Sequence, residues 1–220
     1  ELVFSKIAVE TDKKLTSKGP ITNPRNKWCP THLRPWSDFL EQQRAIFGAL
    51  YDTFPAQSRA FESRSFLAGL GNRISQRSIA NEKTFEHFLH NSLEDPVRAI
   101  IEQLNLNQLR PDQICVYRSN GALAMTRTMV YVSEYKPPHK LTAPHLRLCL
   151  RAMNIPKDVL NRKTIPTSMD PDALFQYLAD RLTASAVTQT YHYMIEEGLE
   201  YGLLTTGEAI VFLRVDWEEP

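Results

Sequence analysis

The sequence is poor in cysteine and glycine and contains no long apolar run. Its 220 residues include three cysteines, Cys29, Cys115 and Cys149, which are too few and too widely spaced for a disulfide framework, so we expect a reducing compartment. No segment approaches the roughly 18–20 consecutive apolar residues of a transmembrane helix. The eight glycines form no glycine-rich phosphate loop. These absences exclude a disulfide scaffold and a P-loop enzyme, and they predict an intracellular protein, nuclear or cytoplasmic, without membrane contact.

Neither sign of charge dominates the whole chain, which has a formal net charge of +1. The two signs are nevertheless separated along it. Residues 101–169 contain ten lysines and arginines against four acidic residues, whereas residues 170–220 contain two against ten. We therefore expect the first segment to face phosphate groups and the second to face water or a partner, although a chance segregation of solvated faces has the same pattern.

The first hundred residues have mostly helical patterns. We interpret residues 1–27 as a flexible basic arm, because most of them are polar or basic. Residues 28–80 are predicted to form a helical accessory subdomain, in which apolar residues at three- and four-residue spacing indicate an amphipathic helix from Pro35 to Phe54. Shorter helices are expected near residues 58–69, 81–91 and 95–104, the last with Asp95 as its N-cap.

Residues 81–220 are predicted to form the core, a sheet with a crossover helix. The expected elements are strands at 114–117 and 129–132 with a turn at 119–121, a basic helix near 143–153, a long helix from Pro171 to Met194, and strands at 199–204 and 209–217. Asp170 suits the N-cap of the long helix, and Gly198 suits its end. This order predicts an α/β or α+β fold, with a central mixed sheet flanked by helices and a helical N-terminal extension.

Acidic residues and a lysine stand at corresponding ends of the two central strands. Asp112 opens the first strand, and Glu134 and Lys136 close the second, where strand alternation points both to one face. Two carboxylates about 4 Å apart repel by roughly 4 kcal/mol at an effective dielectric constant near 20, so a fold tolerates them readily only around a cation. Oxygen ligands suit Mg²⁺ or Mn²⁺. Lys136 beside such an ion can position water and stabilise charge on a phosphate, which predicts metal-assisted phosphodiester hydrolysis.

The sequence Pro111-Asp112, twenty-one residues and then Glu134-Tyr135-Lys136 resembles the PD-(D/E)XK nuclease superfamily, which has the restriction-endonuclease-like fold. The resemblance implies a metal-dependent nuclease in which Asp112 and Glu134 bind Mg²⁺ (or Mn²⁺). It implies that Tyr135 contributes its backbone carbonyl to the metal, while its ring points to the opposite face. Lys136 is expected to assist the attacking water. An exposed ion pair of Glu134 and Lys136 on an edge strand is the simpler alternative.

Gln189 and Tyr193 resemble the QxxxY element of the RecB-like branch of this superfamily. Four residues apart on a helix, they share a face, and the resemblance implies that they orient Lys136 or the phosphate. They are also compatible with packing residues of a long buried helix.

The superfamily often supplies a further carboxylate from its first core helix, and Glu94 stands at the corresponding place. Glu86 and Glu102 are alternatives, and an acid next to a helix start is favourable without any ligand.

Basic residues after the second strand are candidates for contacts with a nucleic-acid backbone. They can hold phosphates without reading sequence, although a solvated basic face explains them equally well. The candidates are Lys140, Arg147, Arg151, Arg162 and Lys163, with Arg147 and Arg151 expected on one helical face. The predicted substrate is nucleic acid, DNA rather than RNA.

Residues 110–217 are also similar to nuclease-like domains of fungal proteins that are sometimes joined to a protein-kinase-like domain. This similarity implies an adjoining domain in a longer chain, and because many nucleases of this fold pair up, a homodimer is a further expectation. The alternative function is a catalytically silent nuclease-fold module that binds nucleic acid or a protein partner.

Overall fold

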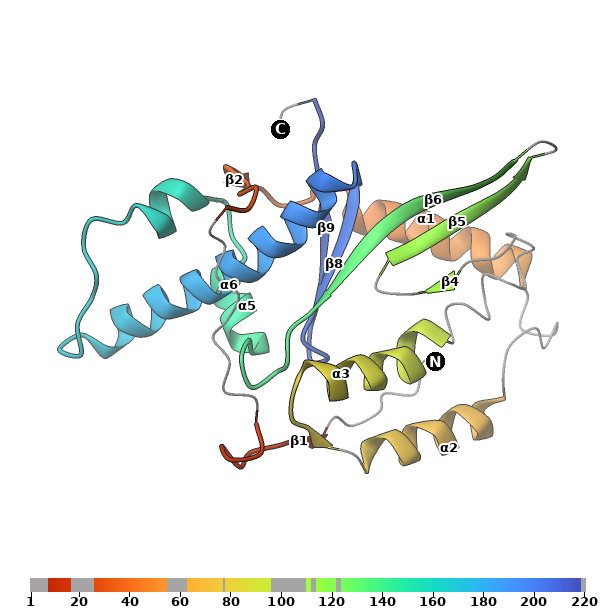
Figure 1. Ribbon diagram of the computed structural model, residues 1–220, viewed down its shortest axis with the longest axis horizontal. Helices are drawn as coiled ribbons and strands as arrows, with labels where there is room; N and C mark the ends of the chain where they lie inside the picture. The colour runs from red at the N-terminus through yellow and green to blue at the C-terminus, as the bar shows by residue number, and fades with distance from the viewer. Residues whose placement is uncertain are drawn as a thin grey trace.

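A five-stranded mixed sheet lies at the centre of the protein, with helices on its faces (Figure 1). The computed structural model describes residues 8–16, 26–54, 63–76, 78–95, 110–111, 114–121 and 124–218. The sheet has the order β4-β5-β6-β8-β9. Its strands are β4 Arg110–Pro111, β5 Ile114–Gly121, β6 Ala124–Tyr135, β8 Tyr201–Thr205 and β9 Ile210–Arg214.

The connectivity of this sheet confirms the predicted mixed α+β fold. β5 and β6 form an antiparallel hairpin, β6 and β8 are parallel, and β8 and β9 are antiparallel. Parallel neighbours need a crossover connection, and the long helix α6, Pro171–Glu196, lies between β6 and β8 in the chain. The hairpin is longer than predicted, because residues 119–121 belong to β5 and Gly121 pairs with Ala124.

Two small sheets join the N-terminal segments to the rest of the chain. β1, Ala8–Val9, pairs in parallel with β3, Ser78–Ile79. β2, His32–Leu33, pairs antiparallel with β7, Met153–Asn154. Leu33 also packs against the buried residues Met153 and Ile155. The second pairing therefore anchors the chain at residue 33 to a segment more than a hundred residues later.

The shorter helices match the sequence prediction in part. They are α1 Phe39–Thr53, α2 Arg64–Ser75, α3 Glu82–Leu89 with a π-helical turn at His90–Glu94, α5 Ala143–Cys149, and a second π-helical turn at Pro156–Leu160. The predicted N-cap at Asp95 is wrong, because Asp95 has helical dihedral angles (φ −61°, ψ −46°) and continues the preceding turn. An N-cap residue lies outside the helical region of φ/ψ space.

The long helix α6 begins at the residue that the sequence predicted and ends two residues later than predicted, at Glu196 instead of Met194. The Asp170 side chain accepts a hydrogen bond from the backbone N–H of Ala173 at 3.0 Å, and Pro171 occupies the first turn. After the helix, Gly198 adopts a positive φ of 64°, a conformation that glycine enters without steric cost.

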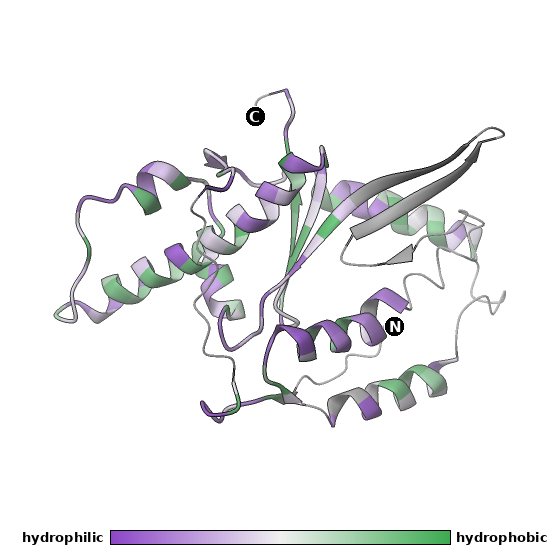
Figure 2. Cartoon of the chain, in the orientation of Figure 1, coloured by the Kyte–Doolittle hydropathy of each residue, from purple (hydrophilic) through white to green (hydrophobic). Residues whose placement is uncertain are grey.

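The main core lies between α6 and the sheet. Ala186 and Val187 of α6 pack with Leu204 of β8, with Leu146 of α5 and with Leu141 just before α5. Figure 2 shows hydrophobic residues on β8 and β9 behind α6. In the described part of the chain, no helix is both long and apolar enough to cross a membrane.

Candidate functional site

The candidate site lies where β6 ends beside β8. Tyr135 is the last residue of β6 and is in register with Thr205 of β8. The backbone N–H of Lys136 donates to the carbonyl of Thr205 at 2.9 Å, so the pairing of the two strands extends one residue further. Lys136 is therefore positioned by the sheet itself.

Successive residues at this end of β6 face opposite sides of the sheet. Val132 packs with Met194 of α6, and Glu134 and Lys136 share that side by strand alternation. Tyr135 faces the other side, where its ring stands edge-on to Phe85 of α3 with the ring centroids 6.0 Å apart. The predicted opposite orientation of the Tyr135 ring agrees with this packing.

The Lys136 ammonium group is the centre of a polar cluster on the α6 side. Its Nζ donates to Oε1 of Glu134 at 2.6 Å and to Oε1 of Gln189 at 2.9 Å. A second carboxylate, Glu82 at the start of α3, reaches the same Nζ at 3.9 Å. Lys136 is 3% exposed, so this charge is almost fully removed from water. A buried ammonium needs such partners, because its desolvation costs several kcal/mol.

The electrostatics of Glu134 reflect the same burial. Burial raises the pKa of the Glu134 carboxyl above its ordinary value, and the nearby Glu82 carboxylate raises it further. The ammonium groups of Lys136 and Lys27 oppose this shift by stabilising the ionised carboxylate. The carboxylate of Glu134 thus has two ammonium groups and a second carboxylate near it. An additional cation would stabilise the two carboxylates in their ionised form.

Tyr193 lies one turn after Gln189 on α6, as the sequence pattern predicted. The ammonium of Lys27 lies over its ring, 4.9 Å from the ring centroid. The neighbouring His192 ring is 5.6 Å from it, and Nε2 of His192 lies 3.3 Å from a carboxylate oxygen of Glu196. Tyr193 therefore borders the polar cluster on the side where the N-terminal segment crosses α6.

Glu94 is not brought together with Glu134 and Lys136. It accepts a hydrogen bond from the Tyr135 hydroxyl, which lies on the opposite side of β6, and it contacts Nδ1 of His90 at 3.1 Å. Burial and the Glu94 carboxylate raise the pKa of the Tyr135 hydroxyl. The predicted ligand Asp112 lies outside the described residues.

Glu82 is the site residue that sequence reasoning missed. It is the first residue of α3, and the preceding Asn81 caps that helix by accepting from the backbone N–H of Thr84 at 2.9 Å. An acid in the first turn of a helix is favourable on electrostatic grounds alone, so the sequence carries no signal that links Glu82 to Lys136. Only the packing of α3 against the end of β6 brings the two together.

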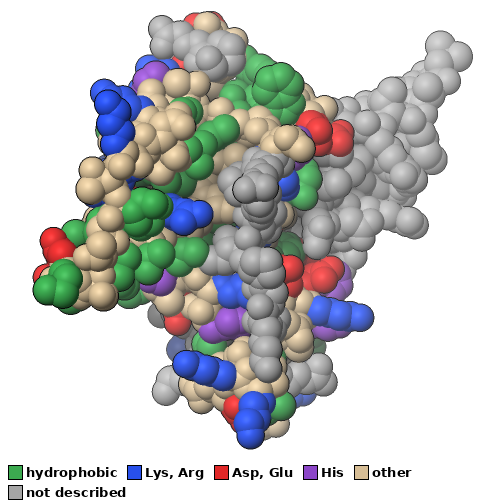
Figure 3. Space-filling model, turned by 60° about the vertical axis from the view of Figure 1, so that its left-hand side comes forward, with side chains coloured by type: hydrophobic (Ala, Val, Ile, Leu, Met, Phe, Trp, Pro, Cys, Tyr) green, Lys and Arg blue, Asp and Glu red, His purple; other side chains and the backbone are tan. Residues whose placement is uncertain are grey.

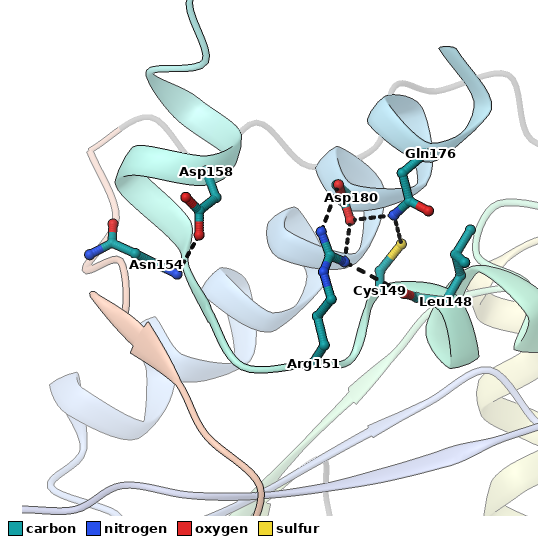
Figure 4. Close-up of polar contacts among 7 residues, drawn as sticks. All are labelled: Leu148, Cys149, Arg151, Asn154, Asp158, Gln176 and Asp180. Carbon is teal, nitrogen blue, oxygen red and sulfur yellow. Dashed lines mark hydrogen bonds and ion pairs between the residues drawn. The ribbon is translucent and has the colours of Figure 1, made fainter. Parts of the chain in front are cut away.

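Arg151 has a structural partner within the protein (Figure 4). Its guanidinium donates to both carboxylate oxygens of Asp180, at 2.7 and 3.1 Å, and Gln176 donates to the same carboxylate at 2.9 Å. Asp180 is 3% exposed. The expectation that Arg147 and Arg151 share a helical face is wrong, because α5 ends at Cys149.

The other basic candidates do not form one patch with the polar cluster. Arg162 lies over the ring of Tyr177, 5.6 Å from its centroid, whereas Arg147 and Lys163 are exposed and Lys140 is partly buried. Figure 3 shows lysine and arginine side chains in separate groups over the visible face. A single basic strip is therefore not visible on this face of the molecule.

The described residues contain no ready-made cluster of three metal-ligating side chains from His, Cys, Asp and Glu. Glu134 and Glu82 supply two carboxylates that converge on Lys136. Asp112, the third predicted acid, lies outside the described residues.

Comparisons with known proteins identify relatives for most of the chain. Residues 102–219 match the family described as Spore killer 2 N-terminal domain. The chain is also similar to the meiotic driver SPOK2 of Podospora anserina, with 23% identity over an alignment that covers 88% of this chain and 32% of that protein. It thus spans about a third of that relative's length. No solved structure matches significantly.

The matched region contains β6, α6 and β8, and with them Glu134, Lys136 and Gln189. The family match covers most of the region for which the sequence predicted a family resemblance. Membership of the PD-(D/E)XK nuclease superfamily stays a prediction. The chain belongs to the Spore killer 2 N-terminal domain family.

Proposed function

We propose that this protein is a metal-dependent nuclease of the PD-(D/E)XK type that hydrolyses phosphodiester bonds in nucleic acid, DNA rather than RNA. The observation that carries the proposal is the meeting of Lys136 with both Glu134 and Gln189. Gln189 is 53 residues away in sequence, and this contact is one of the two roles, orienting Lys136 or the phosphate, that the motif resemblance implied for it. An accidental ion pair on an edge strand would not need a glutamine from the crossover helix.

The donor set fits a divalent cation that prefers oxygen. Glu134 and Glu82 direct carboxylate oxygens at one positive group, and Asp112, which lies outside the described residues, is proposed as the third acid. These three residues would hold Mg²⁺ or Mn²⁺. Glu82 replaces Glu94 in this proposal, because Glu94 is bound to Tyr135 on the other face. When bound, such an ion supplies Lewis-acid stabilisation of the phosphate and lowers the pKa of water.

Lys136 acts as a charge stabiliser in this proposal. Its ammonium group is held in place by Glu134 and Gln189. From there, its positive charge can stabilise a phosphate oxygen on which negative charge develops. Gln189 holds the ammonium in place through its side-chain oxygen, and Tyr193 lines the adjoining surface.

The experiment is a cleavage assay on supercoiled plasmid, linear duplex, single-stranded DNA and RNA with Mg²⁺, Mn²⁺ or EDTA. Wild type is compared with Lys136→Met and Glu134→Gln, and Arg73→Ala serves as the control because Arg73 is exposed on α2, away from every residue proposed for the site. Loss of a positioned catalytic group typically lowers the rate about 10²–10⁴-fold, so we expect at least a hundredfold loss in both site variants. The control should keep wild-type activity.

Thermal unfolding with and without Mn²⁺ separates chemistry from folding. Wild type should gain melting temperature with the ion, and Glu134→Gln should lose that gain while remaining folded. Metal-dependent cleavage that is equal in wild type and both site variants would contradict the proposed residues. Absence of cleavage together with nucleic-acid binding would instead support a catalytically silent module.

The proposal also includes a homodimer of this protein. It further includes an adjoining domain in a longer chain. A duplex cut on both strands requires two active sites or two successive events. Sedimentation velocity with and without a duplex oligonucleotide distinguishes a homodimer from a monomer.

We propose that the protein acts inside the cell, in the nucleus or the cytoplasm, where nucleic acid is present.

A further inference from the structure

The segment Asn26–Trp28 crosses α6 next to the candidate site. Asn26 has a positive φ of 60°, which turns the chain, and asparagine is one of the few residues other than glycine that enters this region readily. The backbone N–H of Trp28 donates to Nδ1 of His192 at 3.3 Å. The sequence analysis assigned Lys27 to a flexible arm, whereas the structure holds it against the helix that carries Gln189 and Tyr193.

The next residues anchor this segment to the core. Cys29 contacts the hydroxyl of Thr188 at 3.6 Å, Pro30 is buried, and His32–Leu33 pair with β7. The position of Lys27 beside α6 is therefore fixed from its C-terminal side by several contacts. A segment held in this way can present its side chains in a defined place.

The Lys27 ammonium belongs to the electrostatic environment of the site. It lies over the Tyr193 ring at 4.9 Å, and its charge acts on the Glu134 carboxyl. Its side chain is only partly buried. Lys27 thus places a positive charge at the rim of the cluster, where a phosphate next to the reacting bond would pass.

Trp28 supplies a second feature of a strand-binding surface. Its side chain is 62% exposed, although tryptophan is usually well buried. Because consecutive Cα atoms are about 3.8 Å apart, the Trp28 side chain is attached to the backbone directly beside that of Lys27. A cation that contacts the backbone and an aromatic ring on which a base stacks are the two components of single-strand binding grooves.

We propose that Asn26–Trp28 positions the substrate: Lys27 contacts a backbone phosphate, and Trp28 stacks on an unpaired base beside the site. The inference rests on the proposed function for the location of the nucleic acid, and it names the substrate class as single-stranded or locally unpaired. Among the described residues, the other charged groups near the segment are the carboxylates of Glu134, Glu82 and Glu196 and the ammonium of Lys136. A bound phosphate therefore needs the positive charge of Lys27 at this rim.

The test is fluorescence anisotropy in EDTA with a labelled single-stranded oligonucleotide and the matching duplex. The variants are Lys27→Ala, Lys27→Arg, Trp28→Ala and Trp28→Phe, with Arg73→Ala and Trp217→Phe as controls, because Arg73 is exposed on α2 and Trp217 follows β9. For Lys27→Ala, the slope of log K against log salt on the single strand should fall by about 0.7, the value for one lost phosphate contact. Trp28→Ala should weaken single-strand binding about tenfold and duplex binding much less.

The conservative variants distinguish contact from folding. Lys27→Arg should keep the salt slope, Trp28→Phe should keep most of the affinity, and both controls should bind as wild type does. In cleavage assays, Lys27→Ala should raise KM while leaving kcat nearly unchanged, as expected for a group that binds ground state and transition state alike.

Failure of this inference differs from failure of the proposed function. An unchanged salt slope in Lys27→Ala overturns the phosphate contact even if wild type cleaves. Equal losses of single-strand and duplex affinity in Trp28→Ala overturn the stacking. A Lys27-dependent slope in a protein that never cleaves would support the inference and contradict the nuclease. Wild type that binds neither oligonucleotide overturns the inference.

Discussion

Buried charged side chains in this protein are stabilised by specific partners. Lys136 is held by Glu134 and Gln189, and Asp180 is held by Arg151 together with Gln176. Removing one member of such a pair leaves the other in a medium where its charge is poorly solvated. A basic residue in the sequence is therefore not automatically available to a phosphate, as Arg151 illustrates.

Replacing Arg151 by alanine should destabilise the fold. Asp180 would remain buried with only weaker donors, and we expect a loss of about 2–3 kcal/mol in the free energy of unfolding, near the lower end for a broken buried pair. Urea unfolding at neutral pH measures it. Arg147→Ala is the control, because Arg147 is exposed and should change stability by less than about 0.5 kcal/mol.

The same pair predicts a pH dependence. Burial alone would raise the pKa of Asp180, but hydrogen bonds from Arg151 and Cys149 hold it below its ordinary value. A lowered pKa in the folded state adds stability above the ordinary carboxyl pKa, about 3.9 for Asp in unfolded chains, and this stability is lost as pH falls towards the folded value. Asp180→Asn should therefore lose less stability than wild type between about pH 5 and pH 3. Parallel pH profiles for the two proteins would contradict this linkage.

At the scale of elements, α6 packs so closely on β8 that there is no room for a side chain at Gly202. An added Cβ on Gly202 of β8 would lie 2.5 Å from Sδ of Met194 and 3.1 Å from Cγ2 of Thr190. Met194 and Thr190 are both buried, so neither side chain can move into solvent. This close approach brings the helix that carries Gln189 down onto the strand that pairs with the end of β6.

Gly202→Ala should therefore cost about 1–3 kcal/mol of unfolding free energy by overpacking. In a Met194→Ala background, where the obstructing sulfur is absent, most of that cost should disappear, and a double-mutant cycle measures the coupling. Gly69→Ala in α2 is the matched control, because no atom lies within 4 Å of its added Cβ, and alanine there should stabilise by up to about 1 kcal/mol. Equal costs of Gly202→Ala in both backgrounds would exclude this explanation.

At the scale of the whole molecule, the two longest helices differ in how they are attached. Ten residues of α6 are buried, whereas α1 has none. The start of α1 contacts the sheet through aromatic rings, with Phe39 and Phe212 centroids 5.0 Å apart and Trp36 stacked on Tyr201 at 5.9 Å. Further along the helix, Tyr51 is 74% exposed.

Hydrogen exchange should reveal this difference. Local opening exposes amides wherever few apolar contacts must be broken, so the amides of α1 should exchange well before those of α6. Mass spectrometry of peptides from both helices measures the rates. Phe39→Ala should accelerate exchange in α1 and leave α6 unchanged. Equal protection of the two helices would show that α1 is attached as firmly as the core.

Part of the candidate site follows local periodicity, and that part could be predicted. Glu134 and Lys136 share a face because strands alternate, and Gln189 and Tyr193 lie one helical turn apart. The predicted roles of Glu94 as a metal ligand and of Arg151 as a phosphate contact fit the structure less well, because Glu94 binds Tyr135 and Arg151 binds Asp180. Both assignments depended on where a helix begins or ends and on which side of the sheet it packs, and no residue pattern near them encodes this.

The amino-acid sequence by itself determined the order of the longer strands β5, β6, β8 and β9 and of α6 between them, the start of α6, and which side chains share a face of each element, because these follow from short-range sterics and hydrogen bonding. Only the tertiary structure decided that Glu82 and Lys27 join Lys136 and Tyr193, while Glu94 binds Tyr135 and Arg151 binds Asp180. The physical reason is burial. Which charges meet depends on which apolar faces pack together, here Phe85 of α3 on Tyr135 and α6 on β8.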